Sequence, residues 1–443
     1  MNLKTTIHIL IIAFLLLGSS AFGFQINFTP RITATEEYTD NLFLDPDHEE
    51  DDFITTISPG FTAEIAGRTR GAAISYDPAY VFYNEYNEFD GWRHSATFSA
   101  WQQMARNTRL EIEDAFLYTE DPVPDDEFIS EFREEPLIEA DTTIRRDRET
   151  YYTNAASFRL IHQFGASDSV YLGYVYGILR NDDPTYEDND THTPSVGLTY
   201  WFLPDWGVDT RAEYTKGQYS DTLDTGDLSD DLEAWEGSAR LIKRFSRQFE
   251  GFAQYNHTYV DYKGDSEDYH VYEPSAGINY TLAEELILTL RAGYFIQDRE
   301  ESDGEEGVLL DGVLSKTWTF RRGSINAVGS SGYEHADFGA ENLGFNRYYL
   351  GGLRAEYGFT RQFTGDVYGS YRRVKYTDIE ETRTDKITET GLGISYQPWQ
   401  WINMRLGYSF HTVDSTDDAD EYDENRVLFT VTLSPANTIR FGR

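Results

Sequence analysis

Six arginines stand at matched distances from a series of short turns, and they are the first candidates for chemistry in this chain. Three lie about six residues before a turn and three lie about four to six residues after one. They are Arg159, Arg211, Arg240, Arg291, Arg354 and Arg405. A guanidinium presents a fixed fork of donors, so a row of such groups would bind carboxylates. Three glutamates lie two to four positions from members of this set, namely Glu213, Glu236 and Glu356.

Two interpretations of these charged residues remain open. In the first, arginine–glutamate ladders brace neighbouring strands of a wide barrel wall. In the second, the arginines form a cationic stripe that guides an anionic solute or polymer. The two can coexist. Both require the arginines to face the same side of a sheet at similar depth, so the strand pattern must place them there.

The elements that would position these residues are strands joined by turns that recur about every 38 residues. The short turns, most of them flanked by Trp or Phe, fall near Gly67–Arg70, Arg106–Asn107, Leu203–Trp206, Ser246–Gln248, Leu282–Glu285, Arg321–Gly323, Thr360–Gln362 and Pro398–Gln400. Longer acidic segments lie midway between them. Pairs of strands with one short and one long connection form the hairpin unit of an up-and-down barrel.

Alternation within the strands predicts which side chains face lipid. Apolar residues alternate with Gly, small polar residues or Arg in three segments that resemble one another, Pro194–Tyr200, Pro274–Tyr280 and Thr390–Tyr396, and in the strands that follow them. The apolar set would face lipid and the other set the lumen. We predict an all-β fold, a transmembrane up-and-down antiparallel β-barrel of about 20 strands, with 18 as the alternative. Its short turns would be periplasmic and its long acidic loops extracellular.

The N-terminus has the features of a secretory signal. Lys4 precedes the apolar stretch Ile7–Leu17, and small residues then offer cleavage after Ala21 or Gly23. An uncleaved anchor is the alternative. We expect a signal peptide at 1–23 and a single transmembrane β-barrel domain at 24–443, with a long loop at 119–149. The expected location is the outer membrane of a Gram-negative envelope.

Composition excludes several classes of function. The net charge of −40 argues against nucleic acid as a partner. The absence of cysteine excludes a lipoprotein anchor, disulfides and thiolate metal sites. Aromatic residues make up 15% of the chain, a content that argues against disorder. We expect no cofactor.

Acidic connections and one long connection could act at the cell surface. Carboxylates crowd into Asp45–Asp52, Asp182–Asp190, Asp298–Glu306 and Asp414–Glu424. None has calcium-loop spacing, so solvated, mutually repelling loops are the main interpretation. Divalent cations that bridge these loops to surface sugars are the alternative. The connection from Thr119 to Glu149 could fold into the lumen as a gate or lie outside as a cap.

Signals for catalysis are weak. The histidines show no metal-ligand spacing, and neither a nucleophile elbow nor a phosphate-binding loop is present. A rim pair such as Asp268 and His270 is the one hint of hydrolytic chemistry. We expect a protein that is not an enzyme, with no catalytic and no metal-binding residues, and an outer-membrane hydrolase is the least favoured alternative.

The N-terminal segment Ile32–Leu44 (ITATEEYTDNLFL), the acidic loop after it, and Ile57–Phe61 (ISPGF) carry a family resemblance. Together with the Pro-Ser-x-Gly-x-x-Tyr strands, they resemble the outer-membrane beta-barrel porin 2 family, which includes members associated with PEP-CTERM and exopolysaccharide gene clusters. The resemblance implies an outer-membrane channel through which secreted polysaccharide leaves. Its partners would be outer-membrane lipid, the polysaccharide and an envelope export complex. The alternative is a structural or adhesive plugged barrel that presents acidic loops.

The C-terminus departs from many outer-membrane barrels, which end in Phe or Trp. Here Pro435 follows the alternating strand, and Phe441 is third from the end. We therefore expect the closing strand either to bend at Pro435 or to stop near Ser434.

Overall fold

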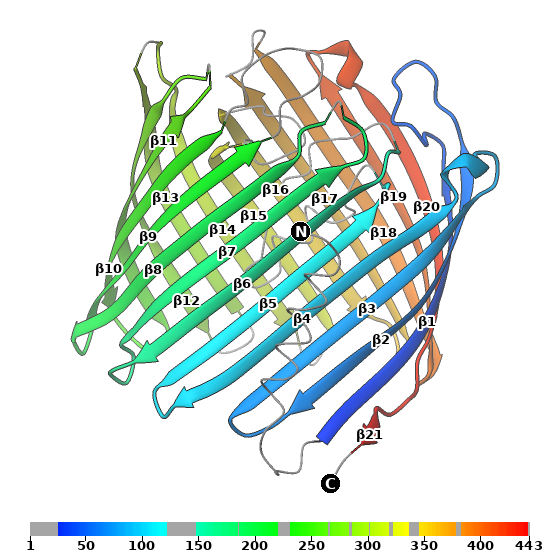
Figure 1. The fold of residues 1–443 in the computed structure, drawn as a ribbon, viewed down its shortest axis with the longest axis horizontal. Coiled ribbons are helices and arrows are strands. Elements are labelled where there is room, and N and C mark those ends of the chain that lie inside the picture. Colours follow the sequence, from blue (N-terminus) through cyan, green and yellow to red (C-terminus); the bar gives the residue numbers. More distant parts are fainter. Residues whose placement is uncertain are drawn as a thin grey trace.

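The computed structural model shows a closed antiparallel β-barrel whose strands run obliquely around a wide interior (Figure 1). It describes residues 25–121, 148–184, 186–219, 231–264, 266–282, 286–300, 302–318, 322–335, 345–377 and 382–441. The predicted signal peptide and most of the 119–149 connection lie outside the described residues. No helix in the described ranges is long and apolar enough to cross a bilayer.

Twenty long strands build the wall in the part of the chain that the structure describes. They are β1 (Gln25–Thr39), β2 (Asp52–Ala66), β3 (Arg70–Tyr83), β4 (Gly91–Ala105), β5 (Thr108–Thr119), β6 (Tyr151–Gln163), β7 (Ser169–Asn181), β8 (Asn189–Leu203), β9 (Trp206–Tyr219), β10 (Leu232–Arg244), β11 (Phe249–Tyr262), β12 (Tyr269–Leu282), β13 (Leu286–Arg299), β14 (Glu306–Trp318), β15 (Gly323–His335), β16 (Phe345–Gly358), β17 (Phe363–Tyr376), β18 (Arg383–Trp399), β19 (Ile402–Ser415) and β20 (Tyr422–Leu433). Two single-turn 3₁₀ helices, Asn87–Phe89 and Asp418–Asp420, lie in long connections. The predicted fold class and strand number are confirmed.

Pairing between the first and last strands closes the barrel. Each strand pairs antiparallel with its neighbour in sequence, and β1 pairs with both β2 and β20. A three-residue strand, β21 (Ile439–Phe441), then pairs with Ile26–Phe28 lower on the same edge of β1. The closing strand therefore stops at Leu433 and resumes beyond Pro435. Proline cannot donate to the ladder, which explains the interruption.

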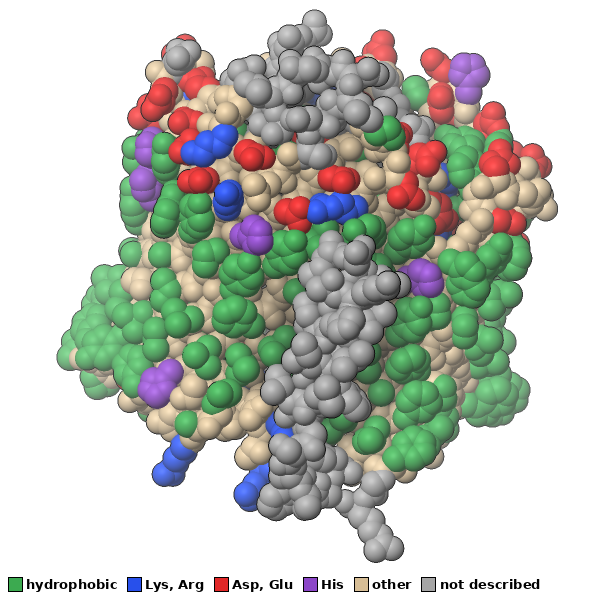
Figure 2. Space-filling view, in the orientation of Figure 1, with side chains coloured by type: hydrophobic (Ala, Val, Ile, Leu, Met, Phe, Trp, Pro, Cys, Tyr) green, Lys and Arg blue, Asp and Glu red, His purple; other side chains and the backbone are tan. Residues whose placement is uncertain are grey.

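Alternation decides which side chains face outward. Leu353, Leu392 and Leu406 are each about half exposed on the outer face, and Figure 2 shows a broad apolar belt across the face in view. Charged residues lie above this belt, on the side of the long connections, and basic residues lie below it. An apolar band of this kind is the surface that a barrel presents to lipid. The opposite residues of each strand face the interior and form the candidate site.

Candidate functional site: the interior wall and the mouth of the barrel

The structure places all six candidate arginines on the inner face, in the half of the barrel nearer the short turns. Arg159, Arg240 and Arg354 each lie four positions before the last residue of their strands, Gln163, Arg244 and Gly358. Arg211, Arg291 and Arg405 lie three to five positions after the first residues of theirs. Because the strands share a tilt, these counts correspond to similar depths.

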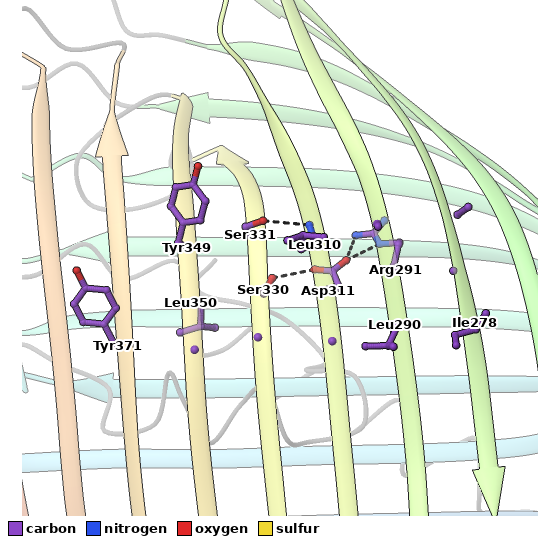
Figure 3. A pocket seen from close by; sticks show the side chains of 16 residues that line it. Ile278, Leu290, Arg291, Leu310, Asp311, Ser330, Ser331, Tyr349, Leu350 and Tyr371 are labelled. Atoms are coloured by element: carbon purple, nitrogen blue, oxygen red, sulfur yellow. Dashed lines mark hydrogen bonds and ion pairs between the residues drawn. The ribbon is translucent and has the colours of Figure 1, made fainter.

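Arg291 braces several strands. It donates to Glu273 of β12 at 2.9 Å and is paired with Asp311 of β14. Asp311 in turn accepts a bond of 2.9 Å from Ser330 of β15, and Figure 3 shows this row across three strands. Such a cross-strand network is what the bracing interpretation describes.

Arg405 braces the wall across an intervening glycine. Its guanidinium donates to both oxygens of Asp366, at 2.7 and 3.0 Å, although these residues lie on β19 and β17. Gly393 of β18 lies beneath the pair, and a Cβ there would come within 2.6 Å of the Arg405 guanidinium carbon. The glycine is therefore what allows the ion pair to span two strands.

A seventh arginine, which the sequence analysis missed, repeats this arrangement. Arg31 of β1 donates to Asp77 of β3 at 2.7 Å and to Thr62 of β2 at 2.8 Å. Gly60 lies under the pair, where a Cβ would come within 3.2 Å of the Arg31 Nε. Gly60 belongs to the Ile57–Phe61 segment, so the glycine in that motif was the available signal.

The glutamates behave differently from one another. Glu213 is paired with Arg211 on its own strand, rather than across strands. Glu236 lies directly opposite Glu213 in the β9–β10 register, and Glu356 lies directly opposite Asp366 in the β16–β17 register. All three glutamates thus lie directly opposite another carboxylate, which is not the ladder that the spacing suggested.

Three of the six arginines have no ion pair among the described residues. Arg159 lies over the ring of Tyr171, 5.1 Å from its centroid. Arg240 lies over Phe252 at 4.4 Å and donates to Gln254 at 2.6 Å. Arg354 lies opposite Tyr368 in register. The described part of the wall therefore contains arginines that brace carboxylates on neighbouring strands and arginines that make no ion pair.

The start of the first long connection, Asn41–Leu44, packs against the inner face of the wall near the mouth of the barrel. Leu42 packs with Ile54, Val81 and Tyr83 on one side of the interior. Leu44 reaches the opposite side of the closure, where it packs with Val413 and Tyr422 of β19 and β20. Leu42 is fully buried and Leu44 is 2% exposed. The apolar residues of the Asn41–Leu44 motif are thus interior anchors.

Asn41 holds this connection in place. Its side-chain amide donates to the carbonyl oxygens of Asp45 at 3.0 Å and Asp423 at 2.9 Å. Its oxygen accepts from the Asp45 amide at 2.9 Å. Leu44 has a φ of 53°, a value that non-glycine residues seldom adopt. The bonds of Asn41 offset the cost of that turn.

A buried network of charged side chains joins the first long connection to the two ends of the 119–149 connection. Arg148 donates to the Leu42 carbonyl at 3.1 Å and to the Tyr83 hydroxyl at 3.0 Å. Arg93 donates to Glu120 at 2.7 Å and pairs with Asp121 at 3.1 Å. Glu120 and Arg148 are each about 95% buried.

Asp121 remains charged within this network. Burial of Asp121 opposes its ionisation, but the charges of Arg93 and Arg148 outweigh burial and lower the pKa of the carboxyl. The two ends of the 119–149 connection therefore lie inside the mouth. Whether the remainder acts as a gate or a cap concerns residues outside those described.

An aromatic cluster fills another part of the interior near the long connections. Tyr269 and Phe295 lie on the inner face of β12 and β13, and Phe345 at the start of β16 packs against both. Tyr333 stacks on Phe345 and donates to Glu273 at 3.2 Å.

The structure separates the two residues considered for hydrolysis. The Asp268 carboxylate accepts from the Tyr262 amide at 2.8 Å. His270 faces outward, stacked on Tyr259 and 3.3 Å from the Nε2 of His257. Among the described residues, no group of three His, Asp or Glu side chains could hold a metal ion.

A groove of about 760 Å³ lies over β12–β17, largely on the outward face. Gly312, Gly329 and Gly351 pair side by side at its floor, and half-exposed Leu310 and Tyr349 stand at its edges. Figure 3 shows its labelled lining residues. Its apolar outward lining belongs to the belt and not to the interior.

No family model and no curated protein sequence matches the chain. Among solved structures, the ferric enterobactin receptor PfeA of Pseudomonas aeruginosa is 8% identical with a TM-score of 0.51, over 92% of this chain and 81% of that one. OccK2 (OpdF) of the same organism, in complex with glucuronate, is 12% identical with a TM-score of 0.44, over 92% and 98%. A BenF-like porin from Pseudomonas fluorescens is 11% identical with a TM-score of 0.45, over 92% and 99%.

These likenesses concern the fold. At 8% identity the enterobactin receptor is similar to this chain in barrel architecture alone. The resemblance to the outer-membrane beta-barrel porin 2 family therefore rests on the sequence motifs.

Proposed function

We propose that this protein is an outer-membrane channel through which an anionic polysaccharide leaves the cell. The observation that carries the proposal is the exposure of charged side chains on the inner face. The side chains of Arg211 and Arg405 are 55% and 40% exposed although they point into a closed barrel. Charged groups retain such exposure in a hydrated interior, and barrels of this width do not fill their interior with wall side chains.

The distribution of charge supports an outward path for an anion. Arginines occupy five of the short turns, namely Arg68, Arg106, Arg247, Arg322 and Arg361. The long connections are rich in carboxylates, as in Asp45–Asp52, and Figure 2 shows acidic residues above the belt. A cationic entrance concentrates anions and an acidic exit disfavours their return, within a Debye length of roughly 8 Å.

A second candidate function is a structural barrel with a closed mouth. The buried Leu42 and Leu44 and the hydrogen bond from Arg148 to the Leu42 carbonyl favour it, because they hold the first connection against the strands on both sides of the β1–β20 pairing. In that case the acidic connections would serve as a surface for sugars or divalent cations.

Conductance of the refolded mature protein in planar bilayers tests the proposal. We expect discrete conductance steps, and a larger conductance when Asn41 is replaced by Ala to release the first connection. Absence of conductance steps in both the wild type and N41A would refute the channel and favour the structural barrel. The control is a variant at the exposed His48 of the same connection, which should behave as the wild type.

A further inference from the structure

A four-strand unit recurs three times around the interior. In each copy an arginine on one strand adjoins an aromatic ring on the next, the ring covers a glycine on the third, and a second arginine follows on the fourth. The copies occupy β6–β9, β10–β13 and β16–β19. Their glycines lie in the three similar segments noted in the sequence, Pro194–Tyr200, Pro274–Tyr280 and Thr390–Tyr396.

The first unit consists of Arg159, Tyr171, Gly197 and Arg211. The Arg159 guanidinium lies 5.1 Å from the centroid of the Tyr171 ring. The ring covers Gly197, where a Cβ would come within 2.6 Å of Tyr171 Cζ. Gly197 pairs in register with Arg211 on the far side. The ring is thus held between the two arginines along the wall.

The second unit repeats this geometry with Arg240, Phe252, Gly277 and Arg291. Arg240 lies 4.4 Å from the centroid of Phe252. A Cβ on Gly277 would come within 2.8 Å of Phe252 Cε1. Gly277 pairs in register with Arg291. Phe252 lies where the first unit has Tyr171, so this arrangement does not depend on a ring hydroxyl.

The third unit is a variant built from Arg354, Tyr368, Gly391 and Arg405. Arg354 lies opposite Tyr368, and a Cβ on Gly391 would come within 2.7 Å of the Tyr368 hydroxyl. Here Arg405 lies over Gly393, two residues further along the same strand. Side chains from the two neighbouring strands therefore cover both glycines of this segment.

The two arginines of each unit differ in charge compensation. The second arginine always has a carboxylate partner: Glu213 for Arg211, Asp311 for Arg291 and Asp366 for Arg405. The first arginine has none among the described residues. These arginines without an ion pair are Arg159, Arg240 and Arg354, and they share the same depth, four positions from their strand ends. The charge of Asp209 still acts on Arg240, and the charge of Glu113 acts on Arg159.

The carboxylates directly opposite Arg159 and Arg240 in register also have other partners. Glu111, opposite Arg159, is paired with Arg109 at 2.8 Å. Asp209, opposite Arg240, accepts a bond of 2.7 Å from Thr199. The rings under Arg159 and Arg240 hold these two guanidinium groups in place. The Nε of Arg240 is engaged by Gln254, so its terminal Nη groups are the donors left for an anion.

We propose that Arg159, Arg240 and Arg354 form three subsites at one depth of the wall for carboxylate groups on a passing sugar polymer. The inference rests on the proposed channel and names its substrate class. A carboxylate matches the guanidinium fork with two parallel bonds. Three subsites at one depth favour a polymer over a monomer, because a chain with many carboxylates engages them together or in succession.

The alternative is that each aromatic ring only stabilises the wall, because the ring fills the space above the glycine that it covers. That role needs the ring and the glycine but not a free guanidinium. Arg→Met variants separate the two, because Met retains the apolar stem over the ring and removes the charge.

The test is block of ionic current by oligomers of polygalacturonate, with neutral dextran oligomers and galacturonate monomer as comparisons. The variant is R159M/R240M/R354M, and the matched control R68M/R247M/R361M removes the same charge from the exposed turns. We expect the triple variant to need at least tenfold more oligomer for half-block, from about threefold per arginine. Neutral dextran should block both proteins equally, and the monomer should block neither strongly.

Lysine at the same three positions should restore much of the block, because it retains the charge. Conductance with unaltered block in R159M/R240M/R354M would overturn the three subsites and leave the channel standing. A loss of block as large in the turn control would also overturn them, in favour of general attraction at the entrance. Absence of conductance in the wild type and in N41A would overturn the channel, and with it this inference.

Discussion

Replacing Asn41 with Ala tests whether the first long connection is held in the mouth by specific bonds. The Asn41 side chain makes three hydrogen bonds of 2.9 to 3.0 Å, and the residue is fully buried. At about 1 kcal/mol for each bond, the closed arrangement would lose about 3 kcal/mol. Since each 1.4 kcal/mol is a factor of ten, the ratio of closed to open mouths should fall about 100-fold.

Single-channel recording measures that ratio as the fraction of time in the larger conductance state. Asn41→Asp should give an intermediate result, because a carboxylate still accepts from the Asp45 amide but cannot donate to the Asp45 and Asp423 carbonyls. His48→Ala is the matched control in the same connection, since the His48 side chain is 84% exposed. A folded N41A barrel with wild-type gating would refute the assignment of Asn41 as the clamp.

Three further predictions concern the glycine under the Tyr171 ring, the charge network of Asp121 and the pairing of β21 with β1. Gly197→Ala should destabilise the barrel by about 2 kcal/mol because the methyl group meets the Tyr171 ring, and adding Tyr171→Ala should recover part of the loss in thermal unfolding. Asp121 has a lowered pKa in the folded state, so the stabilisation that its charge provides is complete above the unfolded pKa of about 4 and disappears as the pH falls through the folded pKa. Gating should therefore stay constant from pH 7 to 5 and change only in stronger acid. Gating that varies between pH 7 and 5 would count against the network of Asp121 with Arg93 and Arg148. Deleting Ile439–Phe441 should leave the β1–β20 closure intact and lower the unfolding temperature by only a few degrees; loss of the folded barrel would show that β21 is essential to closure.

The sequence assigns each arginine to one face of its strand, but it does not assign the partners of the arginines. Alternation is a local property of one strand, so it assigns Arg291 and Arg405 to one face without knowledge of the neighbours. Pairing depends on register between strands distant in sequence. Arg405 reaches Asp366 across Gly393, and Glu356 meets Asp366 instead of an arginine.

The contacts at the mouth of the barrel likewise could not be predicted from the sequence. The Asn41–Leu44 motif was noticed because of its resemblance to a family, and nothing in its composition assigns Leu42 and Leu44 to the interior. Their pockets are built by β2, β3, β19 and β20, which the closure of the barrel brings together. The latch from Arg148 to the Leu42 carbonyl likewise joins two connections that are remote in the chain.

Local regularities in this sequence, namely the spacing of turns and the two-residue period of apolar side chains, were sufficient to determine the barrel, its strand number and the faces of its strands. They suffice because hydrogen bonding within a closed sheet allows few other arrangements of such hairpins. The tertiary structure alone decided which cations are compensated, which rings cover which glycines, and what closes the mouth. Those outcomes depend on register and on closure, which bring together atoms from strands far apart in sequence.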